Sequence, residues 1–343
     1  MKRKSGQVRA GFRRRVGAAR HSTRRAFILA LALGWSCAAL LAGAQEGEKT
    51  PKVGFLSASP LELSLNPFRE GMRLQGYVEG KNMEVRSAAS NPRRLDELAA
   101  DLVRRNVDVI VAGGSDSIGA AQRATNTIPI VMAQTSDAVA SGFVANLARP
   151  GRNITGISSQ AMLVGEKRIQ LIKEAVPTAT RIAVLTNPAN PSHAPGMKVL
   201  DKASRSLGLE IHAVEVREAK DLEAAFRAVA KARADAFLLL PDAMLFSQRA
   251  RILEFALRSR LPSVYWRKEF VEAGGLISYG VDNPAMYRRA ATYVDKILKG
   301  AKPGDLPVEQ PREVEVFVNL KTARALGIQI PQTLLIRADK VIE

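Results

Sequence analysis

The stretch Val107-Asp108-Val109-Ile110-Val111-Ala112, followed directly by Gly113-Gly114-Ser115-Asp116, sets the fold of this chain. The nearly continuous aliphatic run predicts a strand that is covered on both faces, as strands of parallel sheets are. The glycine pair predicts a tight turn into a following helix. A strand that leads through a short turn into a helix is the repeating unit of an α/β sheet.

Similar units precede and follow this stretch. Further strands are expected at residues 52–56, 82–87 and 128–132, with helices between them. One of these helices places Leu95, Leu98 and Leu102 on a single face. The alternation of strands and helices predicts a parallel, doubly wound sheet.

The second half of the chain repeats this pattern. Strands are expected at residues 181–185, 209–216, 234–240 and 261–265. The segment Asn106-Val107-Asp108-Val109-Ile110 corresponds to Arg233-Ala234-Asp235-Ala236-Phe237, and each precedes a loop, a helix and a Pro-containing strand. A repeat this long predicts two lobes of one architecture.

The last part of the chain is expected to cross back between the lobes. A helix is predicted over 284–299, a strand over 313–320, and an extended aliphatic segment over 326–341. We therefore predict an α/β fold of two doubly wound, Rossmann-like lobes joined by hinge strands. The first lobe comprises residues 51–158 plus 282–311, and the second comprises 159–281 plus 312–343. The crossings are expected near 156–159, 280–283 and 310–313.

The formal charge of +18 is concentrated at the N-terminus. Residues 1–44 contain ten Lys or Arg and no Asp or Glu, and the remainder has 41 basic and 33 acidic residues, a net of +8. This remaining excess forms no dense basic run, so we expect no nucleic-acid partner.

The first 44 residues have the three-part order of a signal peptide. A basic stretch ends at Arg24-Arg25, an uncharged apolar run follows over 26–42, and Ala42-Gly43-Ala44 is a small-x-small cleavage signature. The Arg pair also resembles the twin-arginine export motif, so the leader fits either that pathway or the general one. The alternative is a retained membrane anchor. Cys37, the only cysteine, lies within the leader, so the mature chain would contain no disulfide.

The sequence contains few of the residues that catalysis requires. Only His193 and His212 lie beyond the leader, and HExxH, GxSxG, GxGxxG and GxxxxGK[ST] motifs are all missing. A doubly wound dehydrogenase or hydrolase would need a cofactor fingerprint or an activated nucleophile. We therefore predict no catalytic residue, no metal and no cofactor, and favour a binding protein over an enzyme.

Ligands of open parallel sheets bind outside the carboxyl ends of the strands. The loops there contain hydroxyls, amides, carboxylates and aromatic rings, which suit a small polar or amphipathic solute. Asp137 or Asp242 could pair with an ammonium group, and the Gly113–Ser115 turn could receive a carboxylate. The alternative for each Asp is a helix cap or turn, and for Tyr265 and Trp266 it is packing within the lobe.

Several stretches resemble the tryptophan/tyrosine-type substrate-binding proteins of ABC importers, a branch of the type I periplasmic-binding fold. The longest is Ser136 to Gly156, SDAVASGFVANLARPGRNITG. Residues 71–80, 107–112, 124–131 and 318–327 match in the same order, so the resemblance spans nearly all of the mature chain. Ala138 departs from the Pro that this family often has there.

The resemblance implies a periplasmic, two-lobed clamp without catalytic residues, which closes on one solute and docks to a permease in the inner membrane. An amino acid or an aromatic acid is the leading solute, and we expect a monomer. Cleft positions carried over from the family are Ser59, Ser115, Asp137, Asn187, Asp242, Tyr265 and Tyr279.

Two other functions of the same fold stay open from the sequence. A repressor-like sensor would need a DNA-binding headpiece, where this chain has an uncharged apolar run. An exported receptor could instead present its solute to a signalling partner, and the sequence does not separate this role from transport.

Overall fold

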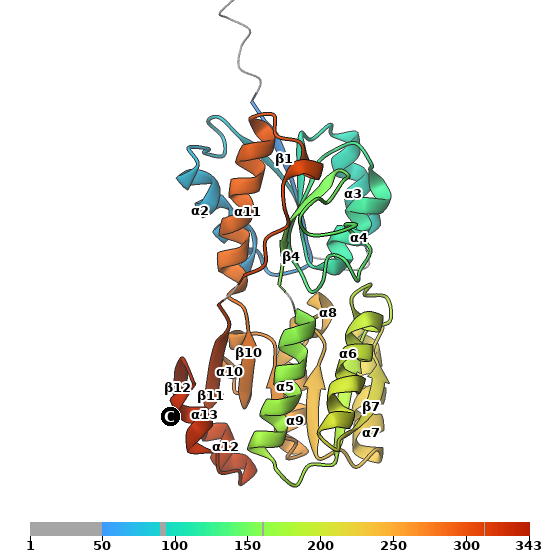
Figure 1. The fold of residues 1–343 in the computed structure, drawn as a ribbon, viewed down its shortest axis with the longest axis vertical. Helices are drawn as coiled ribbons and strands as arrows, with labels where there is room; N and C mark the ends of the chain where they lie inside the picture. Colours follow the sequence, from blue (N-terminus) through green and yellow to red (C-terminus); the bar gives the residue numbers. More distant parts are fainter. Residues whose placement is uncertain (1–49, 90–93, 160, 312) are drawn as a thin grey trace, which may run out of the picture. The chain divides into compact units, whose positions relative to one another are not determined.

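The computed structural model describes residues 50–89, 94–159, 161–311 and 313–343. The described chain forms two sheets, and the first of them contains β1 and β4 as labelled in Figure 1. Its strand order is β2-β1-β3-β4-β5, and all neighbouring strands are parallel. Its strands are β1 (Lys52–Ser57), β2 (Glu84–Ala89), β3 (Val109–Gly113), β4 (Ile130–Thr135) and β5 (Ile154–Ser158).

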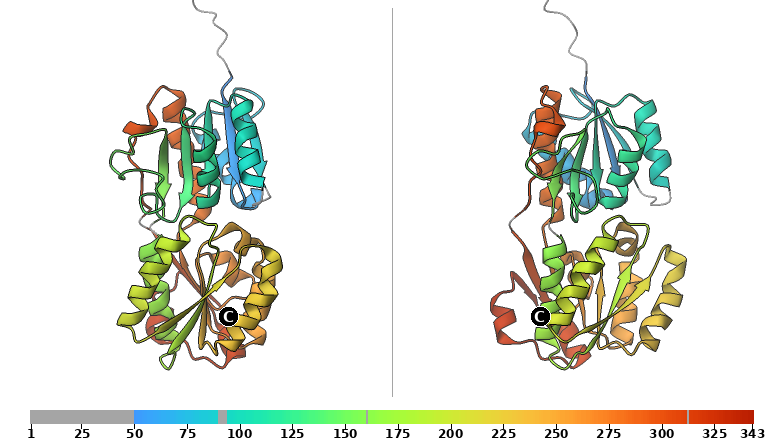
Figure 2. Two further views of the ribbon diagram at one scale, coloured as in Figure 1. Left: turned by 90° about the vertical axis from the view of Figure 1, so that its right-hand side faces the viewer. Right: turned by 45° about the vertical axis from the view of Figure 1, so that its right-hand side comes forward.

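Helices cover both faces of this sheet, as Figure 2 shows. Two of them, α2 (Leu65–Leu74) and α11 (Asn283–Leu298), pack together on one face, and α3 (Leu95–Arg104) and α4 (Ser115–Ala124) pack on the other. Side chains of β3 alternate between the two cores, because successive residues of a strand point to opposite faces. This explains why the strand needs an uninterrupted aliphatic sequence.

The second sheet repeats the first and then extends it. The order β7-β6-β8-β9-β10 is parallel and matches β2-β1-β3-β4-β5; β11 then joins β10 antiparallel, and β12 lies at the edge. The strands are β6 (Arg181–Thr186), β7 (Glu210–Glu215), β8 (Ala236–Leu239), β9 (Ser263–Tyr265), β10 (Ile277–Gly280), β11 (Glu315–Asn319) and β12 (Lys340–Ile342).

Two groups of helices enclose this second sheet. One core is built with α5 (Ala161–Ala175), α6 (His193–Ser206), α12 (Leu320–Leu326) and α13 (Gln332–Ile336). The other is built with α7 (Leu222–Lys231), α8 (Ala243–Ser247), α9 (Arg249–Arg258) and α10 (Lys268–Glu272). Short 3₁₀ turns occupy Leu61–Leu63, Ala219–Asp221 and Pro303–Asp305.

The internal repeat extends to single residues. Asn106 and Arg233 both have a positive φ, 49° and 51°. Two residues later, Asp108 accepts a hydrogen bond from the N–H of Lys52 (2.8 Å), and Asp235 accepts one from the N–H of Arg181 (2.9 Å). Each aspartate therefore ties the third strand of its sheet to the first, and the prediction of two doubly wound lobes is confirmed.

The C-terminal segment differs from the prediction of an extended chain over 326–341. Residues Gln332–Ile336 form α13, and Leu334 is buried in the core. The sequence misled here because a short aliphatic run fits a strand and a buried helix equally well. The predicted signal peptide, residues 1–44, lies outside the described residues. Within the described ranges, no helix has the length and apolar character needed to span a membrane.

Candidate functional site

A cavity lies where strands of the two sheets end at their carboxyl ends. The first lobe contributes Ser59, Gly113, Gly114, Ser115, Asp116, Ser117, Gln134, Ser136 and Asn283; the second contributes Asn190, Pro241, Asp242, Ala243, Phe246, Trp266 and Arg267. The cavity encloses about 30 Å³, and the empty space between these residues, open solvent included, is about 460 Å³. Its position follows the carboxyl-end rule for open α/β sheets.

The turn between β3 and α4 brings backbone close to this cavity. A Cβ on Gly113 would collide with the hydroxyl of Tyr287, so no side chain fits there. Gly114 has φ 91°, a conformation that glycine adopts without steric cost. The turn lets α4 begin at Ser115, where the N–H groups of the first helical turn lack intrahelical acceptors.

Serine hydroxyls connect the lobes beside this turn. The hydroxyl of Ser192, which precedes α6 in the second lobe, lies 2.5 Å from that of Ser115 and 2.9 Å from that of Ser141. Ser115 also contacts the hydroxyl of Thr135 at 3.0 Å. The predicted site residue Ser115 therefore lines the cavity and contacts the opposite lobe.

Asp242 lines the cavity from the second lobe, and both oxygens of its carboxylate accept hydrogen bonds. One oxygen accepts the N–H of Leu245 at 2.9 Å and caps α8. The other accepts the side-chain amides of Asn187 and Asn190, each at 3.1 Å. Asp242 is only 4% exposed, so these donors hold a buried negative charge in a fixed orientation.

Asp116 approaches from the first lobe, in the first turn of α4. Withdrawal from water and the negative charge of Asp242 raise the pKa of Asp116 well above its ordinary value, although Arg123 acts in the opposite direction. Two carboxyl groups from opposite lobes thus share one cavity. A cation placed between them would relieve their repulsion.

An aromatic wall completes the second-lobe side. Phe246 and Trp266 line the cavity and pack against Phe270, with ring centroids 5.6 and 4.8 Å apart. Arg267 lies over Phe246 at 4.3 Å from its ring centroid and forms a two-point ion pair with Glu269, at 3.2 and 2.9 Å. The charge of Arg267 is therefore neutralised within the protein.

The buried His193 side chain accepts a hydrogen bond from the backbone of the Asn187 loop. The Nδ1 atom of His193 lies 2.7 Å from the backbone N of Asn187, so it accepts that N–H and is unprotonated. Its Nε2 atom lies 3.1 Å from the carbonyl of Pro241. Burial lowers the pKa of His193 in spite of the nearby Asp242, which keeps the ring neutral and the loop contact intact.

The predicted site residues fall into two groups. Ser59, Ser115 and Asp242 line the cavity, and Asn187 lies behind Asp242 and orients it. The remaining three, Asp137, Tyr265 and Tyr279, do not line it.

Each residue of the second group has a local structural contact. Asp137 accepts the N–H groups of Val139 and Ala140, at 3.0 and 2.8 Å, which is the turn alternative. Tyr265 is fully buried and stacks on Phe270 at 4.5 Å, which is the packing alternative. Tyr279 packs against the core of the second lobe.

Comparison with known sequences identifies the family. The sequence model of the ABC transporter substrate binding protein family matches residues 53–342. The chain belongs to this family. It is therefore one of a group of binding proteins and not an enzyme.

Individual relatives of this substrate-binding protein agree with that assignment. A tyrosine-binding protein from Clostridioides difficile is 24% identical over 271 residues, 78% of each chain. A conserved domain protein from Vibrio cholerae has TM-score 0.80 and 30% identity, covering 85% of this chain and 100% of that one. A Streptococcus pneumoniae ABC domain solved with L-Trp has TM-score 0.80 and 23% identity, covering 86% and 100%. The fold is that of type I periplasmic-binding proteins.

Sequence reasoning missed several lining residues of the binding protein. The pattern placed Asp116 only in the turn that leads into a helix, and it did not indicate Phe246, Arg267 or Asn283 as lining residues. The signal for Arg267 was available, because it directly follows Trp266 at the carboxyl end of a predicted strand. No sequence rule indicates that Asp116 faces Asp242, because that contact spans two lobes.

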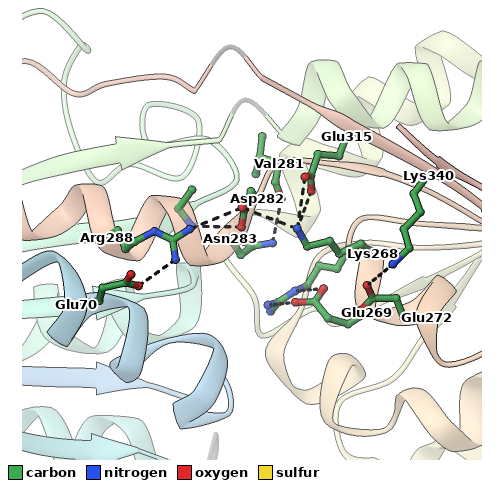
Figure 3. Close-up of polar contacts among 12 residues, drawn as sticks. Glu70, Lys268, Glu269, Glu272, Val281, Asp282, Asn283, Arg288, Glu315 and Lys340 are labelled. Atoms are coloured by element: carbon green, nitrogen blue, oxygen red, sulfur yellow. Dashed lines mark hydrogen bonds and ion pairs between the residues drawn. The ribbon is translucent and has the colours of Figure 1, made fainter. Parts of the chain in front are cut away.

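The chain passes between the lobes beside a charged cluster (Figure 3). Asp282 caps α11 and lies between Lys268 of the second lobe and Arg288 of the first, at 3.8 and 3.9 Å. Lys268 also pairs with Glu315 at 3.0 Å, and Arg288 pairs with Glu70 at 3.3 Å. These contacts place both lobes' charges around one crossing segment of the substrate-binding protein.

Proposed function

We propose that this chain is the extracytoplasmic solute receptor of an ABC importer, binding an amino acid or a related aromatic acid between its lobes. One observation carries the proposal. Carboxyl groups of Asp116 and Asp242, from opposite lobes, face one cavity that also has an aromatic wall.

This arrangement suits an ammonium group better than a neutral solute. A primary ammonium group has three N–H donors, and a carboxylate pair in a partly desolvated cleft attracts it strongly. Phe246 and Trp266 supply apolar surface for the rest of the solute. The tyrosine-binding relative and the neighbour solved with L-Trp support an aromatic side chain.

Closure of the two lobes is the proposed mechanism of capture. Residues 51–158 plus 282–311 would move against 159–281 plus 312–343, with the segments near 156–159, 280–283 and 310–313 as hinges. The serine contacts of Ser192 with Ser115 and Ser141 break when the lobes separate. A solute that touches both lobes stabilises the closed state, which the permease would recognise.

Export completes the proposed function. Residues 1–44 would act as a cleaved signal peptide, and the mature, monomeric protein would work in the periplasm. N-terminal sequencing of the mature protein should begin at Gln45. Retention of the leader in the purified membrane fraction would contradict cleavage.

A thermal-shift screen tests the binding proposal. L-tryptophan, L-tyrosine, other amino acids and aromatic acids are added at millimolar concentration to the purified mature protein. A solute at 100 times its Kd adds about 2.7 kcal/mol to the free energy of unfolding, which raises Tm by several degrees. No shift with any of these solutes would overturn the proposal. Loss of uptake of the identified solute in a deletion strain tests delivery to a permease.

A further inference from the structure

A second buried arginine lies near the crossing segments without an anionic partner. Arg168 of α5 is 2% exposed. Its Nε atom donates to the backbone carbonyl of Tyr279 at 2.8 Å. No carboxylate within the described ranges lies within 4.0 Å of its guanidinium group.

Arg267 shows what is unusual about Arg168. Both side chains are almost fully buried, at 6% and 2% exposure. Arg267 is neutralised by Glu269, whereas Arg168 has a neutral carbonyl as its acceptor. A buried charge without a counter-charge is strongly unfavourable, so proteins seldom retain one without a function. Burial lowers the pKa of Arg168 to about 9, which still leaves the group charged at neutral pH.

Arg168 opens onto a small cavity of its own. The lining residues are Gln134, Ser159, Val164, Arg168, Pro241, Trp266, Val281 and Asn283. Four of them, Gln134, Pro241, Trp266 and Asn283, also line the main cavity, so the two spaces share a wall. The amides of Gln134 and Asn283 add neutral donors beside the guanidinium group.

The two cavities have opposite electrostatic character. The main cavity contains the carboxyl groups of Asp116 and Asp242, which repel an anion approaching the nearby start of α4. The small cavity contains an unneutralised guanidinium group. A zwitterion spanning both would place its positive end between the aspartates and its negative end beside Arg168.

We infer that Arg168, with Gln134 and Asn283, forms a subsite that binds the carboxylate of the transported solute. This inference rests on the proposed function and narrows it, because the solute must then carry a free carboxylate. Arg168 is a specificity-determining residue here, since a guanidinium fork binds both oxygens of a carboxylate.

Paired ligands that differ only in the carboxylate test the inference. Calorimetric Kd values are measured for L-tryptophan and L-tryptophanamide, and for L-tyrosine and L-tyrosinamide, with any other acid from the screen and its amide. The wild-type protein should bind the acid about 100-fold more tightly than the amide. Arg168→Gln should bind acid and amide equally, and Arg168→Lys should keep part of the preference.

Lys167→Gln is the matched control, because it removes a charge from the neighbouring residue of α5 and should retain the acid preference. An unchanged acid preference in Arg168→Gln would overturn the inference and leave the proposed function intact. Equal binding of acid and amide by the wild type would also overturn the inference. This comparison needs no variant, so it stands even if Arg168→Gln fails to fold. Stabilisation by sodium acetate alone, without an acid preference, would assign the subsite to free anions. Absence of binding by every acid and amide would instead overturn the proposed function itself.

Discussion

The two lobes are built alike at one end of their strands and differently at the other. At the amino ends, Asp108 and Asp235 make the same contact from the third strand to the first. At the carboxyl ends, β3 ends at Gly113 and is followed by Gly114, whereas β8 ends at Leu239 and is followed by Leu240-Pro241. The similar amino ends hold neighbouring strands of each sheet together, and the different carboxyl ends enclose the cavity.

The two aspartates at the carboxyl ends, Asp116 and Asp242, differ in how far the protein itself stabilises their negative charge. Asp242 accepts three hydrogen bonds and caps α8. Asp116 lies in the first turn of α4 with a raised pKa. The second lobe therefore presents a charge that the protein already stabilises, and the first lobe presents one that a bound cation would stabilise. Protein stability and solute affinity should separate at these two positions.

Asp242→Ala should have the largest effect. It removes the cap of α8 and leaves two buried amides, those of Asn187 and Asn190, without their acceptor. We expect the free energy of unfolding to fall by about 3 kcal/mol and solute affinity to fall at least about 100-fold. Urea denaturation and calorimetry measure the two quantities.

Asp137→Ala is the comparison variant, since Asp137 also accepts two backbone N–H groups but does not line the cavity. It should lower the free energy of unfolding by about 1 kcal/mol and leave solute affinity within a factor of two. If Asp137→Ala abolishes binding and Asp242→Ala does not, the ammonium lies at the loop after β4.

Asp116→Asn should separate stability from binding. Removing the repulsion with Asp242 should raise the free energy of unfolding of the unliganded protein by about 1 kcal/mol at pH 7. Affinity for a cationic group should fall at least tenfold, because one of the two carboxylates is lost. A variant that is less stable than wild type at pH 7 would show that Asp116 is not strained in the free protein.

The stability that Asp116→Asn gains over the wild type should depend on pH in a defined direction. The pKa of Asp116 is 3.8 in an ordinary setting and is raised in the folded protein. Between pH 3.8 and the raised pKa, the folded chain therefore binds more protons than the unfolded chain. The free energy of unfolding therefore decreases as pH rises through that window, and the full penalty is present above it. The advantage of Asp116→Asn should be largest at neutral pH and should vanish below pH 3.8 in urea titrations.

The sequence predicted the strands well because their burial pattern is local. Ile110 and Ala112 face one core while Val109 and Val111 face the other, so the run had to be aliphatic throughout. The repeat predicted two lobes of one architecture, and the matching orders β2-β1-β3-β4-β5 and β7-β6-β8-β9-β10 confirm it. The segment over 332–336 was predicted incorrectly, because its helix is decided by packing of Leu334 on the sheet.

The site was predicted at the level of loops and less well at the level of side chains. Tyr265 and Trp266 are adjacent, yet only Trp266 lines the cavity while Tyr265 packs in the core. Strand alternation assigns them to opposite sides but does not say which side is which. The sequence does not indicate Arg168, because its burial depends on β10 and on the crossing segments, which are far away in sequence.

The smallest effects are expected at the similar amino ends, where Asp108→Ala and Asp235→Ala form a matched pair. Each should lower the free energy of unfolding by about 1 kcal/mol and leave solute affinity unchanged, because the contacts lie at the strand ends opposite the cavity. Hydrogen bonds from Thr180 and Arg181 lower the pKa of Asp235, so the folded chain binds fewer protons than the unfolded chain below the ordinary value of 3.8. This contribution is present at neutral pH and is lost as pH falls through the lowered pKa, which is opposite in direction to Asp116. Urea titrations of both variants from pH 7 to pH 3 check the trend. A change in solute affinity of more than twofold in either variant would show that the amino ends of the strands also act on the cavity.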